Sequence, residues 1–185
     1  MKKTLLLTVV LMLSATVAFG QAAGVISIFM DPGGLDCNLV DGGLPTNTWN
    51  FVHVSTTGAT AIQFKATLPA CATVTFLSDQ TQFPVTVGGS QTGVAIGYGQ
   101  CLTAPIHVLS IVTFGGGTPA CCVYPITGDP SVPSGTIEVV DCGNNLLTGV
   151  PSHSGRINDD GSCPCSVPVE ETTWGVIKSL YSGTE

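Results

Sequence analysis

Charged side chains are scarce in this sequence, and basic side chains are the scarcest. Only 9% of the 185 residues are charged, and five lysines and arginines stand against twelve aspartates and glutamates. Typical soluble domains carry about 25% charged residues, and helical bundles and coiled coils depend on such residues, so we expect neither architecture here. Binding of nucleic acid needs clustered cations that neutralise phosphates, so the composition argues against a nucleic-acid partner.

Aromatic residues are also few, at 6% of the chain, which leaves little material for stacking against a carbohydrate. Trp49, Tyr98 and Tyr124 would form such a platform only if they were exposed, and Trp49 lies in an alternating pattern typical of a core position. Glycine and proline are abundant instead, with 23 and 12 residues. A hydrophobic share of 44% and a mean hydropathy of +0.44 argue against intrinsic disorder.

One apolar run, over residues 5–19, stands out at the N-terminus. It follows the basic pair Lys2 and Lys3 and ends near Ala18 and Gly20, which is the layout of a secretory signal peptide. We expect a signal peptide over residues 1–20, cleaved after Gly20, with cleavage after Ala22 as the alternative. At about fifteen residues the run is shorter than the ~20 that cross a bilayer.

Removal of the signal peptide would leave three basic residues against twelve acidic ones, a net charge of −9. No later stretch is long and apolar enough to cross a membrane, so we expect a mature chain without a transmembrane segment. The sequence therefore predicts a protein that is secreted to the exterior or to the cell surface, with the periplasm as the alternative compartment.

Eight cysteines follow the predicted signal peptide, and their number is even. In an oxidising compartment such a set predicts four disulfides. The close pairs are Cys121-Cys122 and Cys163-Pro164-Cys165, and neither has the spacing of a zinc knuckle. The histidines, His53, His107 and His153, are scattered singly. The cysteines are Cys37, Cys71, Cys101, Cys121, Cys122, Cys142, Cys163 and Cys165.

Eight cysteines permit 105 pairings, so the sequence constrains the connectivity only in part. Cys121 and Cys122 would point to opposite faces of a strand, so we expect them to take different partners. Cys71 and Cys101 each lie at the end of a strand-like run, which predicts that they pair with each other. Cys163 and Cys165 would tie a C-terminal extension to the body of the domain.

Short β-rich runs recur about every ten residues between residues 24 and 142, with turn residues between them. In residues 61–68 the apolar Ile62, Phe64, Ala66 and Leu68 alternate with Ala61, Gln63, Lys65 and Thr67, as in a strand with one buried face. In residues 94–98 the outward positions are Ala95 and Gly97, so we expect that face to be closely covered. The nine predicted strands are residues 25–30, 49–54, 61–68, 73–77, 84–87, 94–98, 106–114, 121–126 and 136–140. This spacing predicts an all-β, antiparallel sandwich over residues 21–145, with a barrel as the alternative.

The run from Thr57 to Phe64 and the run from Ile106 to Ile111 resemble two strands of the cohesin-like family. The first is similar to that family's passage from a small-residue turn into an inward strand, and the second to its central strand. The resemblance implies a nine-stranded jelly-roll, immunoglobulin-like sandwich and a non-catalytic extracellular recognition module. The dense cysteines depart from the usual pattern of the family.

The chain changes character after Cys142. Residues 146–165 are expected to be a cysteine-containing loop extension, and residues 166–185 a linker and a tail. Residues 173–181 predict a short helix with Trp174, Ile177 and Tyr181 on one face. The tail resembles the shared endings of secreted bacterial proteins, which implies sorting, surface attachment or docking on its own domain.

Catalytic signatures are weak. The run Gly88-Gly89-Ser90-Gln91-Thr92-Gly93 misses the G-x-S-x-G pattern of a nucleophilic serine by one position, and it reads as a hairpin turn. Alternation places Glu138 and Asp141 on opposite faces, with Glu138 solvated and Asp141 in a turn, so they do not form the carboxylate pair of a glycosidase. We expect no enzymatic activity.

Calcium is the cofactor for which the sequence contains candidate ligands. The first loop gathers carboxylates and an amide, and residues 156–161 resemble half of a D-x-N-x-D-G calcium loop. Arg156 at the first ligand position and Val167 at the twelfth depart from that pattern, so we expect turn-forming residues rather than ligands. The candidate ligands are Asp31, Asp36, Asn38, Asp41, Asn158 and Asp160.

Together these patterns predict a secreted binding or surface-assembly module that recognises a protein or a cell-surface polymer. One alternative is a subunit of an extracellular layer or filament, since low charge and abundant Gly, Thr and Val favour self-association through strand edges. The other alternative is a secreted hydrolase.

Overall fold

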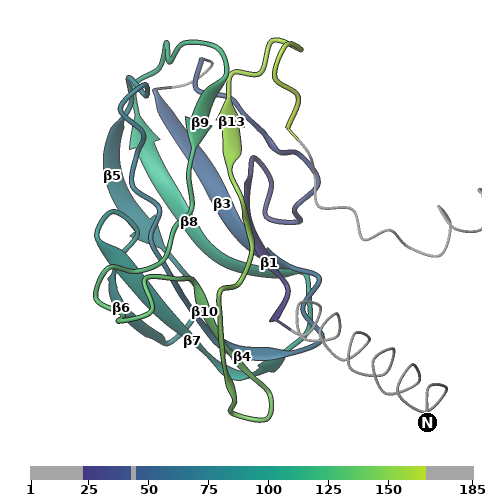
Figure 1. Ribbon diagram of the computed structural model, residues 1–185. Helices are drawn as coiled ribbons and strands as arrows, with labels where there is room; N and C mark the ends of the chain where they lie inside the picture. The colour runs from purple at the N-terminus through teal and green to yellow at the C-terminus, as the bar shows by residue number, and fades with distance from the viewer. Residues whose placement is uncertain (1–22, 43–44, 166–185) are drawn as a thin grey trace, which may run out of the picture.

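The protein is built from β-strands, as a computed structural model shows (Figure 1). The structure describes residues 23–42 and 45–165. In these residues it contains thirteen strands. They are β1 (Val25–Phe29), β2 (Asn38–Leu39), β3 (Thr46–Val54), β4 (Ala59–Phe64), β5 (Thr75–Gln80), β6 (Val85–Gly89), β7 (Gly93–Leu102), β8 (Ile106–Phe114), β9 (Cys122–Tyr124), β10 (Glu138–Asp141), β11 (Leu146–Thr148), β12 (Ser152–His153) and β13 (Gly155–Ile157).

The strands form two five-stranded sheets and one small sheet. The first sheet has the order β12-β1-β3-β8-β5, the second β11-β10-β4-β7-β6, and the small one β2-β13-β9. All pairs are antiparallel except β1 with β12 and β2 with β13. In Figure 1 the long strands β3 and β8 run side by side, while β4, β6, β7 and β10 gather in the lower part of the molecule.

Large side chains from both five-stranded sheets meet in one core. Phe51 on β3 lies against Phe64 on β4, with ring centroids 5.4 Å apart, and Trp49 meets Tyr124 edge-on at 5.7 Å. All four side chains are fully buried. Each such burial stabilises the fold by about 1.5–3 kcal/mol. The two sheets therefore pack face to face through the inward positions of alternating strands.

Four disulfides cross-link the described chain, which leaves no free cysteine in it and indicates an oxidising compartment. The pairs are Cys37–Cys165, Cys71–Cys122, Cys101–Cys142 and Cys121–Cys163. The prediction that Cys121 and Cys122 take different partners is confirmed. So is the expectation that Cys163 and Cys165 tie the C-terminal extension to the body.

The predicted pairing of Cys71 with Cys101 is wrong, and the sheet order explains why. Strand β4 lies between β7 and β10, so Ala59 has Leu102 on one side and Asp141 on the other. Cys101 and Cys142 therefore meet across β4. They close over Gly58, where an added Cβ would come 2.6 Å from the Cys142 sulfur. Glycine is required at this position because the bridge fills the space of a side chain.

Each of the nine predicted ranges overlaps a strand of the structure, with shifted ends in most cases, but the described residues form thirteen strands rather than nine. Residues 146–165 differ from the predicted loop, because they contain β11, β12 and β13. These three strands have two or three residues each, too few for an alternation pattern to show. The predicted signal peptide over residues 1–20 and the predicted tail helix lie outside the described residues. No helix in the described part has the length and apolarity needed to cross a membrane.

Replacing Cys101 and Cys142 together by serine should destabilise the domain. The bridge joins residues 41 apart in sequence, and a loop of this size contributes about 2–4 kcal/mol by restricting the unfolded chain. Urea unfolding of the double variant and the parent would measure the difference. Mass mapping under non-reducing conditions should show the other three pairs unchanged. An unaltered unfolding midpoint would contradict this role of the bridge.

Candidate functional site

The outer face of the second sheet carries a row of small and aliphatic side chains that crosses all five strands. In the pairing register Leu146 lies opposite Val140, Val140 opposite Ala61, Ala61 opposite Gly97, and Gly97 opposite Val85. Residues in register share a face of the sheet, so the five positions form one line. The alternate residues of β4 and β7 point inward to the core.

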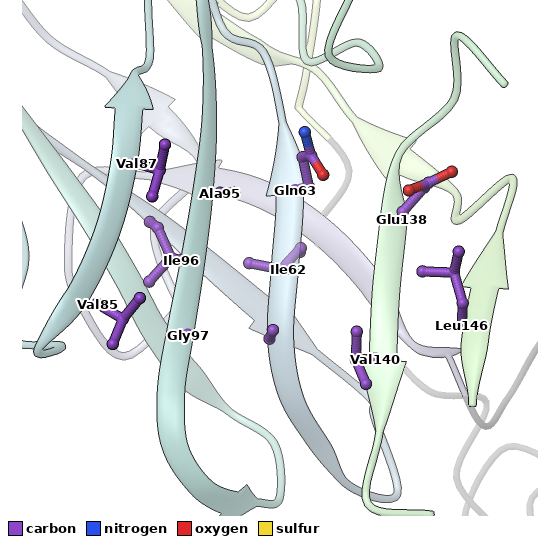
Figure 2. A pocket seen from close by; sticks show the side chains of 11 residues that line it. Ile62, Gln63, Val85, Val87, Ala95, Ile96, Gly97, Glu138, Val140 and Leu146 are labelled. Atoms are coloured by element: carbon purple, nitrogen blue, oxygen red, sulfur yellow. The ribbon is translucent and has the colours of Figure 1, made fainter. Parts of the chain in front are cut away.

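A second row lies two residues along the strands on the same face. It consists of Thr148, Glu138, Gln63, Ala95 and Val87, each again opposite the next. The two rows form an open trough with a volume of about 250 Å³, which is shown in Figure 2. We use the name trough for this cavity between β6 and β11.

The trough has a low floor and raised sides. Its floor is made by Ala61, Ala95 and Gly97, whose small side chains leave space above the sheet. On the β6 side Val85 and Val87 are 56% and 67% exposed, and on the β11 side Leu146 is 59% exposed. The expectation that Ala95 and Gly97 lie on a closely covered face is wrong, because this face is open. The trough is therefore an exposed aliphatic surface on the outer face of the second sheet.

Glu138 is the one ionisable side chain that lines the trough. It is only 8% exposed, so its interpretation as a solvated residue is wrong. Ser134 Oγ donates a hydrogen bond of 2.8 Å to Glu138 Oε1. The loop before β10 folds back over the carboxylate, and an alternation pattern within the strand does not reveal this cover.

Asp129 holds the side chain of Gln63 in place, next to Glu138 in the trough. Gln63 Nε2 donates to Asp129 Oδ2 at 2.9 Å, and the backbone N–H of Ser131 donates to Oδ1 at 2.8 Å. Burial acts to raise the pKa of Asp129, but these hydrogen bonds outweigh it and hold the pKa below its usual value. The carboxylate packs on Gly93, which has a φ of +132° and no room for a Cβ. Glycine is needed there because the φ is positive and because a side chain would clash with the Asp129 carboxylate.

The first group of predicted calcium ligands serves as turn residues. Asp31 accepts the backbone N–H groups of Leu35 and Asp36 at 2.8–3.0 Å, and Asp36 accepts that of Asn38 at 3.0 Å. Asn38 points elsewhere, with its Oδ1 accepting the backbone N–H of Asp159 at 2.9 Å. The bonds to Asp31 and Asp36 are the local hydrogen bonds by which aspartate shapes turns, whereas Asn38 joins two distant segments.

Asp41 and Asn158, which come from separate predicted segments, do meet. Asn158 Nδ2 donates to Asp41 Oδ1 and to the carbonyl of Thr118, both at 2.7 Å, and the backbone N–H of Thr118 donates to Asp41 Oδ2 at 3.0 Å. Burial acts to raise the pKa of Asp41, but the hydrogen bonds from Thr118 and Asn158 hold it below its usual value. The oxygens are thus used to join two loops, and calcium binding here stays a prediction.

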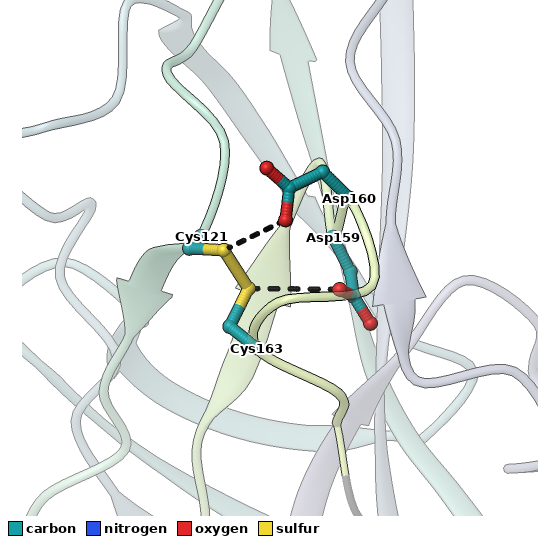
Figure 3. Close-up of side chains that lie close together, drawn as sticks. All are labelled: Cys121, Asp159, Asp160 and Cys163. Carbon is teal, nitrogen blue, oxygen red and sulfur yellow. Dashed lines mark hydrogen bonds between the residues drawn. A yellow bond between two sulfur atoms is a disulfide. The ribbon is translucent and has the colours of Figure 1, made fainter.

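Asp160 lies apart from these residues, beside a disulfide. Cys121, Asp159, Asp160 and Cys163 bring their ligand atoms within 4.8 Å of one another (Figure 3). Asp160 Oδ1 is 3.5 Å from Cys121 Sγ, and Asp159 Oδ1 is 3.6 Å from Cys163 Sγ. Because the sulfurs are bonded to each other, they have neither a proton to donate nor the thiolate charge that binds a metal.

A serine and a histidine meet on the outer face of the first sheet, but their hydrogen bond has the wrong direction for nucleophilic catalysis. Asn50 Nδ2 donates to the carbonyl of Met30 at 2.8 Å, which turns Asn50 Oδ1 toward Ser110. Ser110 Oγ therefore donates to that oxygen at 2.8 Å and accepts from His107 Nε2 at 2.9 Å. A nucleophilic serine would donate its proton to the histidine instead.

The aromatic residues singled out for carbohydrate stacking are all in the core. Trp49, Tyr98 and Tyr124 are buried, and burial raises the pKa of both tyrosines. These three residues therefore form no exposed platform. The trough was not identified from the sequence, although Ala95 and Gly97 at outward positions are its sequence signal.

Comparison with known protein families finds no family model that matches this chain, and a search of curated proteins finds no match. The cohesin-like resemblance is therefore a prediction from the sequence.

His53 should make the stability of the fold depend on pH. Its ring is fully buried, with Nε2 2.6 Å from the carbonyl of Ala23 and Nδ1 3.3 Å from the Tyr98 hydroxyl. Burial lowers the pKa of His53 from 6.5, so below that pH the unfolded chain binds a proton that the folded chain does not. Stability should therefore fall as the pH drops below about 6.5, by up to ~1.4 kcal/mol per pH unit for one group.

Urea unfolding of the parent and of His53→Gln between pH 5 and 8 would measure this dependence. Glutamine keeps a donor for the Ala23 carbonyl but does not titrate, so the variant should show a flatter profile. His107, whose pKa burial also lowers, contributes with the same sign, and His107→Gln is the matched comparison. Identical pH profiles for the parent and His53→Gln would refute the assignment.

Proposed function

We propose that this chain is a secreted, non-catalytic binding module of the cohesin-like type, which acts at the cell exterior by binding a protein or assembling at the surface. The single observation that carries the proposal is the trough. It presents three strongly exposed aliphatic side chains, Val85, Val87 and Leu146, over a floor of small residues. Surfaces of this kind on stable domains are typical of protein–protein recognition.

Two further observations support this reading. The four disulfides suit export, in agreement with the signal peptide expected over residues 1–20. The direction of the hydrogen bonds from His107 through Ser110 to Asn50 favours a structural role for that group rather than hydrolysis. Two packed five-stranded sheets support a sandwich, and we propose the cohesin-like jelly-roll topology as its finer description.

A subunit of an extracellular layer or filament is the second candidate, and strand β6 favours it. This strand is an edge of the second sheet and pairs only with β7, over five consecutive residues without a register shift. Its residues, Val85–Gly89, include no charged side chain and no proline. Charges, prolines and bulges are the usual means by which edge strands avoid pairing with another copy.

Replacement of Val87 by aspartate should weaken binding without unfolding the domain. The substitution places a charge on the exposed β6 side of the trough, where burial against a partner would leave it unpaired. The mature protein, labelled with a fluorophore, would be titrated onto cell envelopes of the source organism. Saturable binding should weaken by at least about tenfold, the effect of a 1.4 kcal/mol loss.

Leu77→Asp is the matched control, because Leu77 is 51% exposed on β5 of the other sheet. This variant should bind like the parent. Equal loss in both variants, or turnover of a glycan or polymer substrate by the parent, would count against the proposed function. Size-exclusion chromatography distinguishes the second candidate, which requires large assemblies of the purified chain.

A further inference from the structure

We infer that the trough receives a lysine side chain of a partner protein, with the methylenes of the lysine over the aliphatic floor and its ammonium group at Glu138. This inference rests on the proposed function, because it specifies the chemistry of the partner that the trough would bind. It is carried by a buried carboxylate, a fixed acceptor oxygen and the distance between the two rows.

Glu138 is more than nine-tenths buried, and neither basic side chain of the described residues forms an ion pair with its carboxylate. In residues 23–42 and 45–165 its one hydrogen-bond partner is Ser134, which contacts Oε1, so Oε2 has none. The nearby Lys65 does not pair with it and acts electrostatically on Asp129. Because the carboxylate lines the trough and a carboxylate oxygen forms its strongest hydrogen bonds with charged donors, this position favours a ligand that brings a positive charge.

A second acceptor lies beside Glu138. Gln63 is directly opposite it in the register of β4 and β10, where facing Cβ atoms are about 4.5–5.5 Å apart. Because Gln63 Nε2 donates to Asp129 Oδ2, the amide orientation is fixed, and Oε1 is left as an acceptor. Figure 2 shows both polar ends at the same end of the trough. A ligand group that binds both acceptors at once must carry at least two protons that it can donate in hydrogen bonds.

The remaining trough fits an aliphatic stem. The row of Val140, Ala61 and Gly97 lies two residues from the row of Glu138, which is about 6.8 Å along antiparallel strands. The four-carbon stem of lysine covers such a distance and gains contact with apolar surface while its ammonium stays polar. The described residues carry two basic and nine acidic side chains, so their field attracts a cation.

An ammonium group suits this site better than a guanidinium group. Arginine binds carboxylates best through two parallel hydrogen bonds, one to each oxygen. At Glu138 the oxygen Oε1 already accepts from Ser134, so Oε2 is the oxygen whose full acceptor capacity is left for a ligand. Lysine, as a compact charge with three donors, can bind Glu138 Oε2 and Gln63 Oε1 together.

The shape of the trough favours a lysine on a protein over a free amine. The trough is open along the sheet surface, and the exposed Val85, Val87 and Leu146 extend beyond what one stem would cover. These side chains would contact the residues that flank the lysine. A partner segment with aliphatic residues on either side of a lysine has the matching pattern.

The test compares two capped pentapeptides, Ala-Val-Lys-Val-Ala and the same sequence with norleucine in place of lysine. Norleucine keeps the four-carbon stem but lacks the ammonium group. Binding to the ¹⁵N-labelled mature protein would be followed through the amide signals of Ala95 and Gly97. The lysine peptide should bind about tenfold more tightly than the norleucine peptide, the effect of one hydrogen bond to a charged group.

Glu138→Gln should abolish this preference, because it removes the charge and keeps the shape and an acceptor for Ser134. Asp36→Asn is the matched control, since it removes one carboxylate charge from an exposed loop on another part of the molecule. It should keep the preference. Free n-hexylammonium should bind more weakly than the lysine peptide, and tighter binding of the free amine would overturn the assignment to a protein partner.

Equal binding of the two peptides by the parent, or a preference that survives in Glu138→Gln, would overturn the lysine assignment. These outcomes leave the proposed function intact if Val87→Asp still weakens envelope binding. The opposite outcome is also informative. If Glu138→Gln loses the lysine preference while Val87→Asp binds envelopes like the parent, the lysine assignment stands and the proposed function fails.

Discussion

Packing of Phe51 against Phe64 is the contact on which the arrangement of the molecule depends. The two rings come from facing strands of different sheets and lie 5.4 Å apart in a fully buried core. Because strand side chains alternate, the inward position of Phe64 determines that Gln63 and Ala61 point outward. A shift of β4 by one residue would reverse every position on that strand, and the trough would disappear with the core.

The disulfides hold this arrangement in a chain with few other means of stabilisation. With two basic residues in the described part, ion pairs contribute little, and its many glycines make ordering of the backbone entropically costly. Cys101–Cys142 closes over β4 at the end of the sheet that carries the trough, and Cys37–Cys165 joins residues 128 apart in sequence. Two of the cross-links also reach buried apolar clusters, through Cys122 in the main core and through Cys37 beside Phe29 and Val52.

The features that follow from local periodicity were predictable from the sequence, and those that depend on the order of strands were not. The positions of nine of the thirteen strands follow from alternation and turn residues, which a short window of sequence shows. Cys121 and Cys122 take different partners as predicted, although Cys121 lies in the turn before β9 and not on a strand face. The pairing of Cys101 with Cys142 depends on β4 lying between β7 and β10, which are far apart in sequence. The burial of Glu138 depends on the loop that contains Ser134, and the trough on the register of five strands.

A sheet surface with an aliphatic floor can still select its ligand. An aliphatic floor accepts many apolar groups, so Ala61, Ala95 and Gly97 supply contact but little discrimination. Discrimination comes from the two acceptors at the end of the trough, because a ligand without donors would cover Glu138 Oε2 and Gln63 Oε1 without giving them a hydrogen bond. Both acceptors are held by neighbours within the domain, Glu138 by Ser134 and Gln63 by Asp129. A ligand therefore meets groups that are already oriented, and little conformational entropy is lost on binding.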